Sequence, residues 1–179
     1  MSTNTVTPTG REVFFDRKDY IVSKTNLKGH ITYANDIFLD IAGYTEEEVI
    51  GKPHNMICHP DMPRCVVKLL WDTIQTGSEI FAYVVNMAKN GDHYWVLAHV
   101  TPSYDSAGQI VGYHSTRRVP NPQTVQGVIV PLYNELRSIE RGNSSAKDGM
   151  QASFDRLVEV LAEKETEYDE LIAALARAA

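Results

Sequence analysis

The sequence predicts an α+β protein, in which a five-stranded antiparallel sheet carries short helices on one face and is followed by C-terminal helices. Three observations support this class. β-rich runs occur at both ends of region 19–120, helix caps and helical periodicity lie between them, and apolar residues recur at helical spacing after residue 121. Strands grouped on either side of helices indicate one antiparallel sheet that is covered on a single face.

The first two strands are expected to form a hairpin. Runs at 20–24 and 30–33 flank residues 26–29, which have the composition of a turn. Asn35 then stands where a helix N-cap belongs, and Gly43 ends "DIFLDIAG". A second short helix is expected in "TEEEVIG", because Thr45 and Glu48 have the spacing of a capping box.

The stretch "HPDMPRCVVKLLW", residues 59–71, joins a tight turn to an apolar helix. The helix is expected over 62–76, with an apolar stripe that includes Val66, Leu70 and Ile74. Strands are expected at 80–88, 93–103 and 110–117, because "KNGD" and "DSAG" between them are typical hairpin turns.

The remaining segments are expected to extend this domain at both ends. Residues 1–18 have the composition of a flexible or capping segment. A connecting helix is expected over 121–141, with a kink or break at Pro131. This helix could pack on the protein's own sheet or on a partner.

One amphipathic, coiled-coil-like helix is expected over 148–178, and we expect it to pack between molecules. Apolar residues occupy its a and d positions, and Lys164 is the one polar residue on the seam. The apolar seam residues are Met150, Phe154, Leu157, Leu161, Tyr168, Leu171 and Leu175.

Composition narrows the function classes. The formal charge of −6 disfavours nucleic acid as a partner. No apolar stretch is long enough for direct membrane insertion, and the N-terminus lacks the pattern of a signal peptide, so a cytoplasmic location is expected. No catalytic motif is present, and neither the two cysteines nor the six histidines have metal-ligand spacing. The protein is therefore expected to have no catalytic residues and no metal site.

A ligand pocket between the sheet and the helices is better supported. Asn35, Asn86 and His99 lie on or beside elements that should face this layer, and an amide in a strand is unfavourable without a reason. The alternatives are ordinary: Asn86 could point outward, Trp71 could be plain core, and His99 could be a hydrogen-bonded core histidine.

Two motifs give a more specific indication. "GYTEEEVIGKPHNMICHPDMP" together with "KNGDHYWV" resembles the PAS sensory domain of bacterial aerotaxis receptors, and the resemblance covers about residues 19–120. The first part of the longer motif is typical of PAS domains in general, whereas "HPDMP" followed by "KNGDHYWV" is typical of the aerotaxis subfamily. The resemblance implies non-covalent FAD binding and a sensor that passes redox state to a chemotaxis signalling partner.

The same resemblance implies which residues contact the cofactor. The family's turn His and Asp fall on His59 and Asp61, and its helix Trp falls on Trp71. Its strand Asn falls on Asn86, and the Asn that begins the first helix falls on Asn35.

Cys58 departs from the family pattern, which has an Arg before the "HPDMP" turn that supports FAD binding. A thiol cannot replace a bidentate guanidinium, so Arg64 or Lys68 could substitute, the FAD affinity could be reduced, or the cofactor could differ. A light-driven cysteine–flavin adduct is not expected, because His54 occupies the position of the reactive cysteine in light-sensing relatives.

The expected function is therefore that of an FAD redox sensor without enzymatic turnover. It is expected to form a homodimer and to contact a chemotaxis transducer through its C-terminal helices. The chain lacks the membrane-spanning and kinase-control regions of full-length receptors in the family, so it is expected to be a fragment or a stand-alone partner of a separate transducer. The alternatives are a haem-binding gas sensor, with His99 or His59 as axial ligand, and a cofactor-free dimerisation module.

Overall fold

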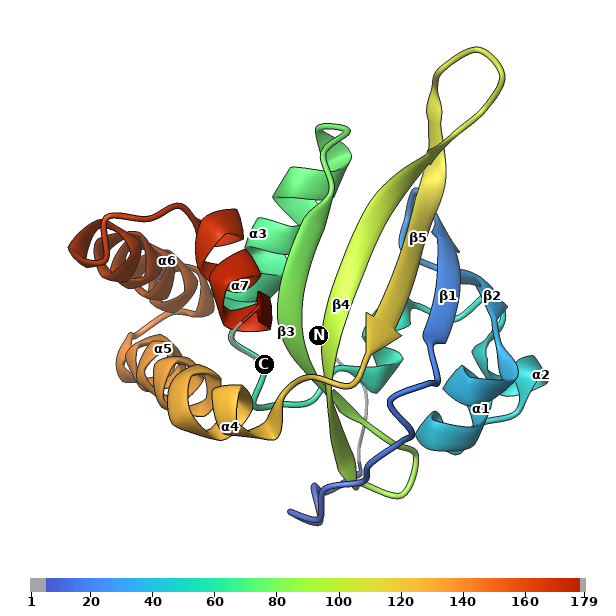
Figure 1. Ribbon diagram of the computed structural model, residues 1–179, viewed down its shortest axis with the longest axis horizontal. Helices are drawn as coiled ribbons and strands as arrows, with labels where there is room; N and C mark the ends of the chain where they lie inside the picture. Colours follow the sequence, from blue (N-terminus) through green and yellow to red (C-terminus); the bar gives the residue numbers. More distant parts are fainter. Residues whose placement is uncertain (1–5, 178–179) are drawn as a thin grey trace. The chain divides into compact units, whose positions relative to one another are not determined.

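The computed structural model describes residues 6–177 and confirms the predicted fold class. Its five-stranded antiparallel sheet has the order β2-β1-β5-β4-β3 (Figure 1). The strands are β1 (Ile21–Asn26), β2 (Ile31–Ala34), β3 (Ile80–Met87), β4 (His93–Tyr104) and β5 (Ile110–Arg118).

The chain divides into two compact units that are interleaved in sequence. The first, which we call the sheet unit, contains the described residues up to His59 together with Thr73–Val119. The second, the helical unit, contains Pro60–Asp72 and the described residues from Pro120 onward. The chain therefore leaves the sheet unit after His59, returns at Thr73 and leaves again after Val119.

Three helices that follow β2 begin and end close to the expected residues. They are α1 (Asp36–Ala42), α2 (Glu46–Val49) and α3 (Arg64–Gln75), whereas the 3-10 helix η1 (His54–Ile57) between α2 and α3 was not predicted. Asn35 caps α1, and Gly43 ends it in the left-handed conformation with φ of 72°. The backbone N–H of Thr45 donates to Glu48 Oε2 at 3.0 Å, as the predicted capping box requires. No helix among residues 6–177 is long and apolar enough to cross a membrane.

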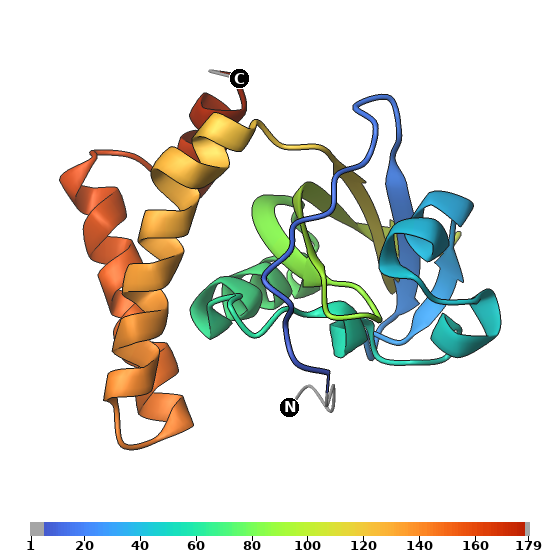
Figure 2. The ribbon, with the colours of Figure 1, turned by 90° about the horizontal axis from the view of Figure 1, so that it is seen from below.

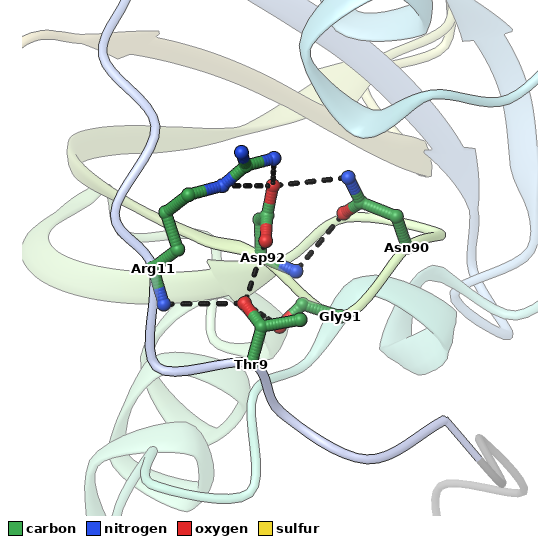
Figure 3. A network of polar contacts seen from close by, with 5 residues as sticks. All are labelled: Thr9, Arg11, Asn90, Gly91 and Asp92. Carbon is green, nitrogen blue, oxygen red and sulfur yellow. Dashed lines mark hydrogen bonds and ion pairs between the residues drawn. The ribbon is translucent and has the colours of Figure 1, made fainter.

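The N-terminal segment is a strap along the β3–β4 turn, and backbone hydrogen bonds hold residues 9–13 there. The N–H of Thr9 donates to Gly91 O at 2.9 Å, and that of Val13 donates to His93 O at 2.8 Å. Asp92, which is 2% exposed, accepts a hydrogen bond from the Thr9 hydroxyl and forms an ion pair with Arg11 (Figure 3). These donors hold the pKa of Asp92 at about 2. Residues 1–5 of the predicted segment lie outside the described residues.

Arg11→Gln is expected to loosen this strap, because it removes the cation that pairs with Asp92. Amide exchange at Val13 and His93 should then become faster, and the thermal midpoint should fall. Arg17→Gln is the matched control, since Arg17 is exposed in the same segment. Equal exchange at these amides in the wild type and in Arg11→Gln would show that the backbone pairing alone holds the strap.

The helical unit begins with an irregular helix. The elements α4 (Pro122–Thr124), the π turn η2 (Val125–Ile129) and α5 (Val130–Gly142) follow one another without a gap. Pro131 stands in the first turn of α5. A π turn widens the helix before a proline, which relieves the clash between the ring and the preceding turn. The predicted disturbance at Pro131 is therefore a local widening, and the helix continues.

The C-terminal region is two helices, so the expectation of one continuous helix over 148–178 is wrong. α6 (Ala146–Glu163) and α7 (Tyr168–Arg177) are separated by a turn in which Glu165 has φ of 52°. α6 lies beside α5, with which it forms a helical hairpin (Figure 2). Of the predicted seam residues in α6, only Leu157 is fully buried, because the α5-facing stripe runs through Gly149, Ser153, Leu157 and Val160. Residue 178 lies outside the described residues.

Candidate ligand-binding site

One face of the sheet collects polar side chains from four strands. Asn86 stands opposite Tyr94 across β3 and β4, and Ala98 stands opposite Arg117 across β4 and β5. Side chains alternate between the faces of a strand, so Asn86, Tyr94 and Arg117 lie on the same face. The polar residues of this face are Ser23, Thr25, Asn86, Tyr94, Ser115 and Arg117. We call it the polar face.

Two of the short helices cover this face. His54 of η1 lies against Arg117, and its Nε2 is 2.6 Å from Arg117 Nη2 and 3.1 Å from Ser23 Oγ. Phe38 of α1 is fully buried, and its ring centroid lies 5.7 Å from the Arg117 guanidinium carbon. The polar face is thus enclosed by α1 and η1.

Several buried polar atoms on this face have no hydrogen-bond partner among the residues that the structure describes. They are Thr25 Oγ1, Asn86 Nδ2, Tyr94 Oη, Ser115 Oγ and Arg117 Nη1. More than nine in ten buried polar groups in folded proteins are hydrogen-bonded. A group of five such atoms on one sheet face therefore points to a ligand that supplies acceptors, since all five atoms belong to groups that can donate.

Arg117 is the most unusual member of this group. It is 3% exposed, and Nη2 donates to Ser23 Oγ at 2.8 Å. Burial lowers the pKa of Arg117 to about 10, so the guanidinium is charged at neutral pH. No carboxylate among residues 6–177 forms a salt bridge with it. An unpaired buried charge is strongly unfavourable, so this position favours an anionic or carbonyl-rich ligand.

His54 is neutral beside this cation. Desolvation, followed by the charge of Arg117, lowers the pKa of His54 to about 3. Because Arg117 has only donors, Nε2 of His54 must accept, and the ring proton belongs on Nδ1. His54 therefore holds the guanidinium in place without neutralising its charge.

Comparison with known proteins agrees with this geometry. The sequence profile of the family described as "PAS fold" matches residues 31–117, which is almost the whole span from β2 to β5. The chain contains a PAS domain.

Two curated relatives illustrate the range of similarity. Over 118 residues the chain is 42% identical to the aerotaxis receptor of Escherichia coli (strain K12), a match that covers 66% of this chain and 23% of that receptor. It is 26% identical over 119 residues to phototropin-1A of Oryza sativa subsp. japonica, and there it covers 63% of this chain and 13% of the relative. The chain thus spans less than a quarter of the length of either relative.

Solved structures show the same fold. A light-oxygen-voltage domain examined with a flavin analogue has a TM-score of 0.55 and 20% identity, over 65% of this chain and 87% of that one. The dark structure of the blue-light photoreceptor Aureochrome1 LOV has a TM-score of 0.54 and 23% identity, over 66% and 86% of the two chains. At this identity the likeness concerns the fold alone.

Asn86 is the sequence-predicted residue that the polar face of the PAS domain does include. Its side chain is 4% exposed, and its backbone pairs with Cys58 in an isolated bridge at the edge of the sheet. Cys58 and His59 therefore lie next to β3. Burial raises the pKa of the Cys58 thiol, which makes it a poor nucleophile. His59 is 6% exposed, and its ring packs edge-on against His93 with centroids 5.6 Å apart.

Asn35 organises the PAS fold through its side chain. Its Oδ1 accepts from the N–H groups of Val22 and Phe38, each at 3.0 Å, and its Nδ2 donates to Tyr20 O at 2.8 Å. The amide thus joins β1 to the start of α1. Its predicted role as an N-cap is confirmed, whereas these backbone contacts give no support to a contact with a cofactor.

The expectation that His99 faces the same layer as Asn86 is wrong. His99 stands opposite Phe81 and Thr116 in the ladders, which places it on the other face of the sheet. Its ring stacks on Phe81 at 4.1 Å, and Nε2 lies 2.6 Å from Glu79 Oε2 at the surface. β4 is apolar on both faces, so the apolar neighbours of His99 did not reveal which way it points.

Asp61 and Trp71 belong to the helical unit. Asp61 is half-exposed and forms an ion pair with Arg137 of α5. Trp71 is half-buried in α3. The cations considered as substitutes near Cys58 also have partners, since Arg64 pairs with Glu140 and Lys68 pairs with Asp72.

Sequence reasoning missed Arg117 and the part that His54 plays beside it. The available signal was an arginine pair, Arg117–Arg118, at the end of a strand. Alternation requires that one of the two point inward. The buried cation of the site therefore lies in β5, far in sequence from Cys58.

Proposed function

We propose that this PAS domain binds a flavin, FAD, non-covalently on the polar face and acts as a redox sensor. The observation that carries the proposal is Arg117, a buried cation without a carboxylate partner among the described residues, surrounded by unsatisfied polar atoms. The relative that is 42% identical is an aerotaxis receptor, a sensory protein by its name.

The residues present fit the acceptor-rich edge of a flavin ring. That edge carries two carbonyl oxygens and two acceptor nitrogens, and the polar face offers Asn86 Nδ2, Tyr94 Oη and Arg117 Nη1. Bound flavin supplies a centre that can be reduced and reoxidised, with its electronics tuned by nearby charges and hydrogen bonds. A fixed guanidinium stabilises the negative charge that reduction brings, so Arg117 would raise the reduction potential.

The residues of this chain fit haem less well than they fit flavin. If haem were bound through a histidine, a ring nitrogen of that histidine would have to bind the iron. His99 lies on the other face, and Nε2 of His54 accepts from Arg117. His59 is the one predicted haem ligand that stays near Asn86, through its neighbour Cys58.

The output side of the proposal follows the relative. A signal would leave the sheet unit through Val119–Pro120 and through His59–Pro60, where the chain enters the helical unit. We infer a chemotaxis-type signalling partner that contacts the C-terminal helices, a homodimeric and cytoplasmic protein, and a sensor without enzymatic turnover.

The deciding experiment is an absorption spectrum of the purified protein before and after addition of dithionite. Paired blue and near-ultraviolet bands that bleach on reduction are expected, and release by heat followed by chromatography should give FAD and not FMN. A Soret band would show that haem is bound in place of flavin, and His59 would then be the residue to mutate. A protein that stays colourless after incubation with FAD would refute the proposal of a flavin sensor and favour a cofactor-free interaction module.

A further inference from the structure

Helix α3 takes its N-terminal cap from another helix. The residues before its first turn are Met62 and Pro63, and neither has a side-chain oxygen. The backbone N–H of Cys65 instead donates to Glu140 Oε1 of α5 at 3.1 Å. A carboxylate at this position satisfies an unpaired N–H and interacts favourably with the helix dipole.

Glu140 is built into the helical unit at the point where α3, α5 and α6 meet. It is 7% exposed, and Oε1 also accepts from Ser153 Oγ at 2.9 Å. Its Oε2 accepts from Arg64 Nε at 3.3 Å. Both oxygens therefore have donors, as a buried carboxylate requires. The three donors come from two different helices, so the carboxylate fixes both of them to α5.

The two helices of the α5–α6 hairpin approach each other closely at the same residue. A Cβ added to Gly149 of α6 would lie 2.4 Å from the carbonyl oxygen of Glu140. Any side chain at this position would force the two helices apart. The close crossing is what brings Ser153 within reach of Glu140.

A second contact joins the hairpin to the turn before α3. Arg137, whose side chain is 11% exposed, forms an ion pair with Asp61, and Arg141 lies 3.8 Å from the same carboxylate. Residues three and four apart share one side of a helix, so Arg137, Glu140 and Arg141 present one charged surface to the 61–65 segment. Asp61 of the turn and the start of α3 at Arg64 and Cys65 are therefore all held by side chains of α5.

We propose that Arg137 and Glu140 form a latch on the start of α3, and that this latch transmits the ligand state of the sheet unit to the α5–α6 hairpin. The transmission step rests on the proposed function. Cys58 pairs with Asn86 of the polar face, and only His59 and Pro60 separate Cys58 from Asp61. A movement of the Asn86 backbone would therefore be passed to Asp61, because the connecting segment is only two residues long. Asp61 is then a positioning residue for the hairpin.

The test is hydrogen exchange in the oxidised and the dithionite-reduced protein, with a charge exchange at the latch. Arg137→Glu and Asp61→Lys should each speed exchange at Cys65 and Val66 about five- to tenfold, and each should remove the difference between the redox states. The double variant, with Arg137→Glu and Asp61→Lys, restores an ion pair of opposite polarity. It should recover the slow exchange at Cys65 and Val66 and the difference between the redox states. Gly149→Ala should act like the single variants, whereas Gly142→Ala, at an open position of α5, should not.

The outcomes separate the two proposals. Wild-type exchange at Cys65 in Arg137→Glu would overturn the latch, with or without bound flavin. Faster exchange with a preserved redox difference would overturn the transmission step alone. A colourless protein would refute the proposed function and the transmission step, while exchange at Cys65 in the variants would still decide whether the latch exists.

Discussion

Arg117→Met is expected to abolish flavin binding while leaving the ligand-free protein at least as stable as the wild type. Methionine keeps most of the length of the arginine stem and removes a buried charge that has no carboxylate partner among the described residues. Replacement of buried ionic groups by apolar ones is often neutral or stabilising by about 1–4 kcal/mol. Loss of a charge-assisted contact to the ligand should weaken binding roughly a hundredfold or more. The two effects have opposite signs.

The measurements are the midpoint of chemical unfolding without flavin and the flavin affinity by fluorescence titration. Arg118→Met is the matched control, since Arg118 is the exposed neighbour on the other face and should change neither quantity. If Arg117→Met destabilises the ligand-free protein and binds flavin normally, then Arg117 has a structural role and the ligand assignment is wrong.

Acid should destabilise the protein through His54. The pKa of this residue is about 3 in the folded state, whereas an unfolded histidine has a pKa of about 6.5. Between these values the unfolded chain binds one more proton than the folded chain does. The contribution of neutral His54 is therefore fully present above about pH 6.5 and falls progressively towards pH 3, by a few kcal/mol in all.

His54→Gln isolates this contribution. The glutamine carbonyl can accept from Arg117 in place of Nε2, and it does not titrate. The free energy of unfolding, measured by urea at several pH values, should fall less steeply in the variant between pH 6.5 and 3. Carboxylates such as Asp92 contribute equally to both proteins and cancel in the difference. Parallel curves would mean that water reaches the His54 ring and that it is protonated normally in the folded state.

Local chemistry explains why the fold was predictable. Asn35, Thr45 and the two turns after β3 and β4 act over a few residues, so the sequence alone places them. The "HPDMP" and "KNGDHYWV" motifs then identified the family, which composition could not do.

Which residues of β4 and β5 face the site could not be predicted, because a single strand does not contain that information. β4 has apolar residues on both faces, and the second half of β5 has polar residues on both faces, so the phase of the alternation in each strand is set only by its partners. This is why Arg117 was missed and His99 was placed on the wrong face. The side of α6 that packs on α5 was missed for a related reason: Gly149 and Ser153 face α5 through backbone proximity and a hydrogen bond to Glu140, and hydrophobic periodicity registers neither.

The interleaving of the two units has a practical consequence for anyone who wishes to isolate the PAS domain. A fragment that ends at Val119 would retain the whole sheet, but it would also retain residues 60–72, whose own unit is completed by the C-terminal helices. Cys65 is fully buried in the intact chain, and it would lose the neighbouring Glu140 and Ser153. In this protein the boundary between the sheet unit and the helical unit is not a single point along the chain, and a single cut cannot separate them.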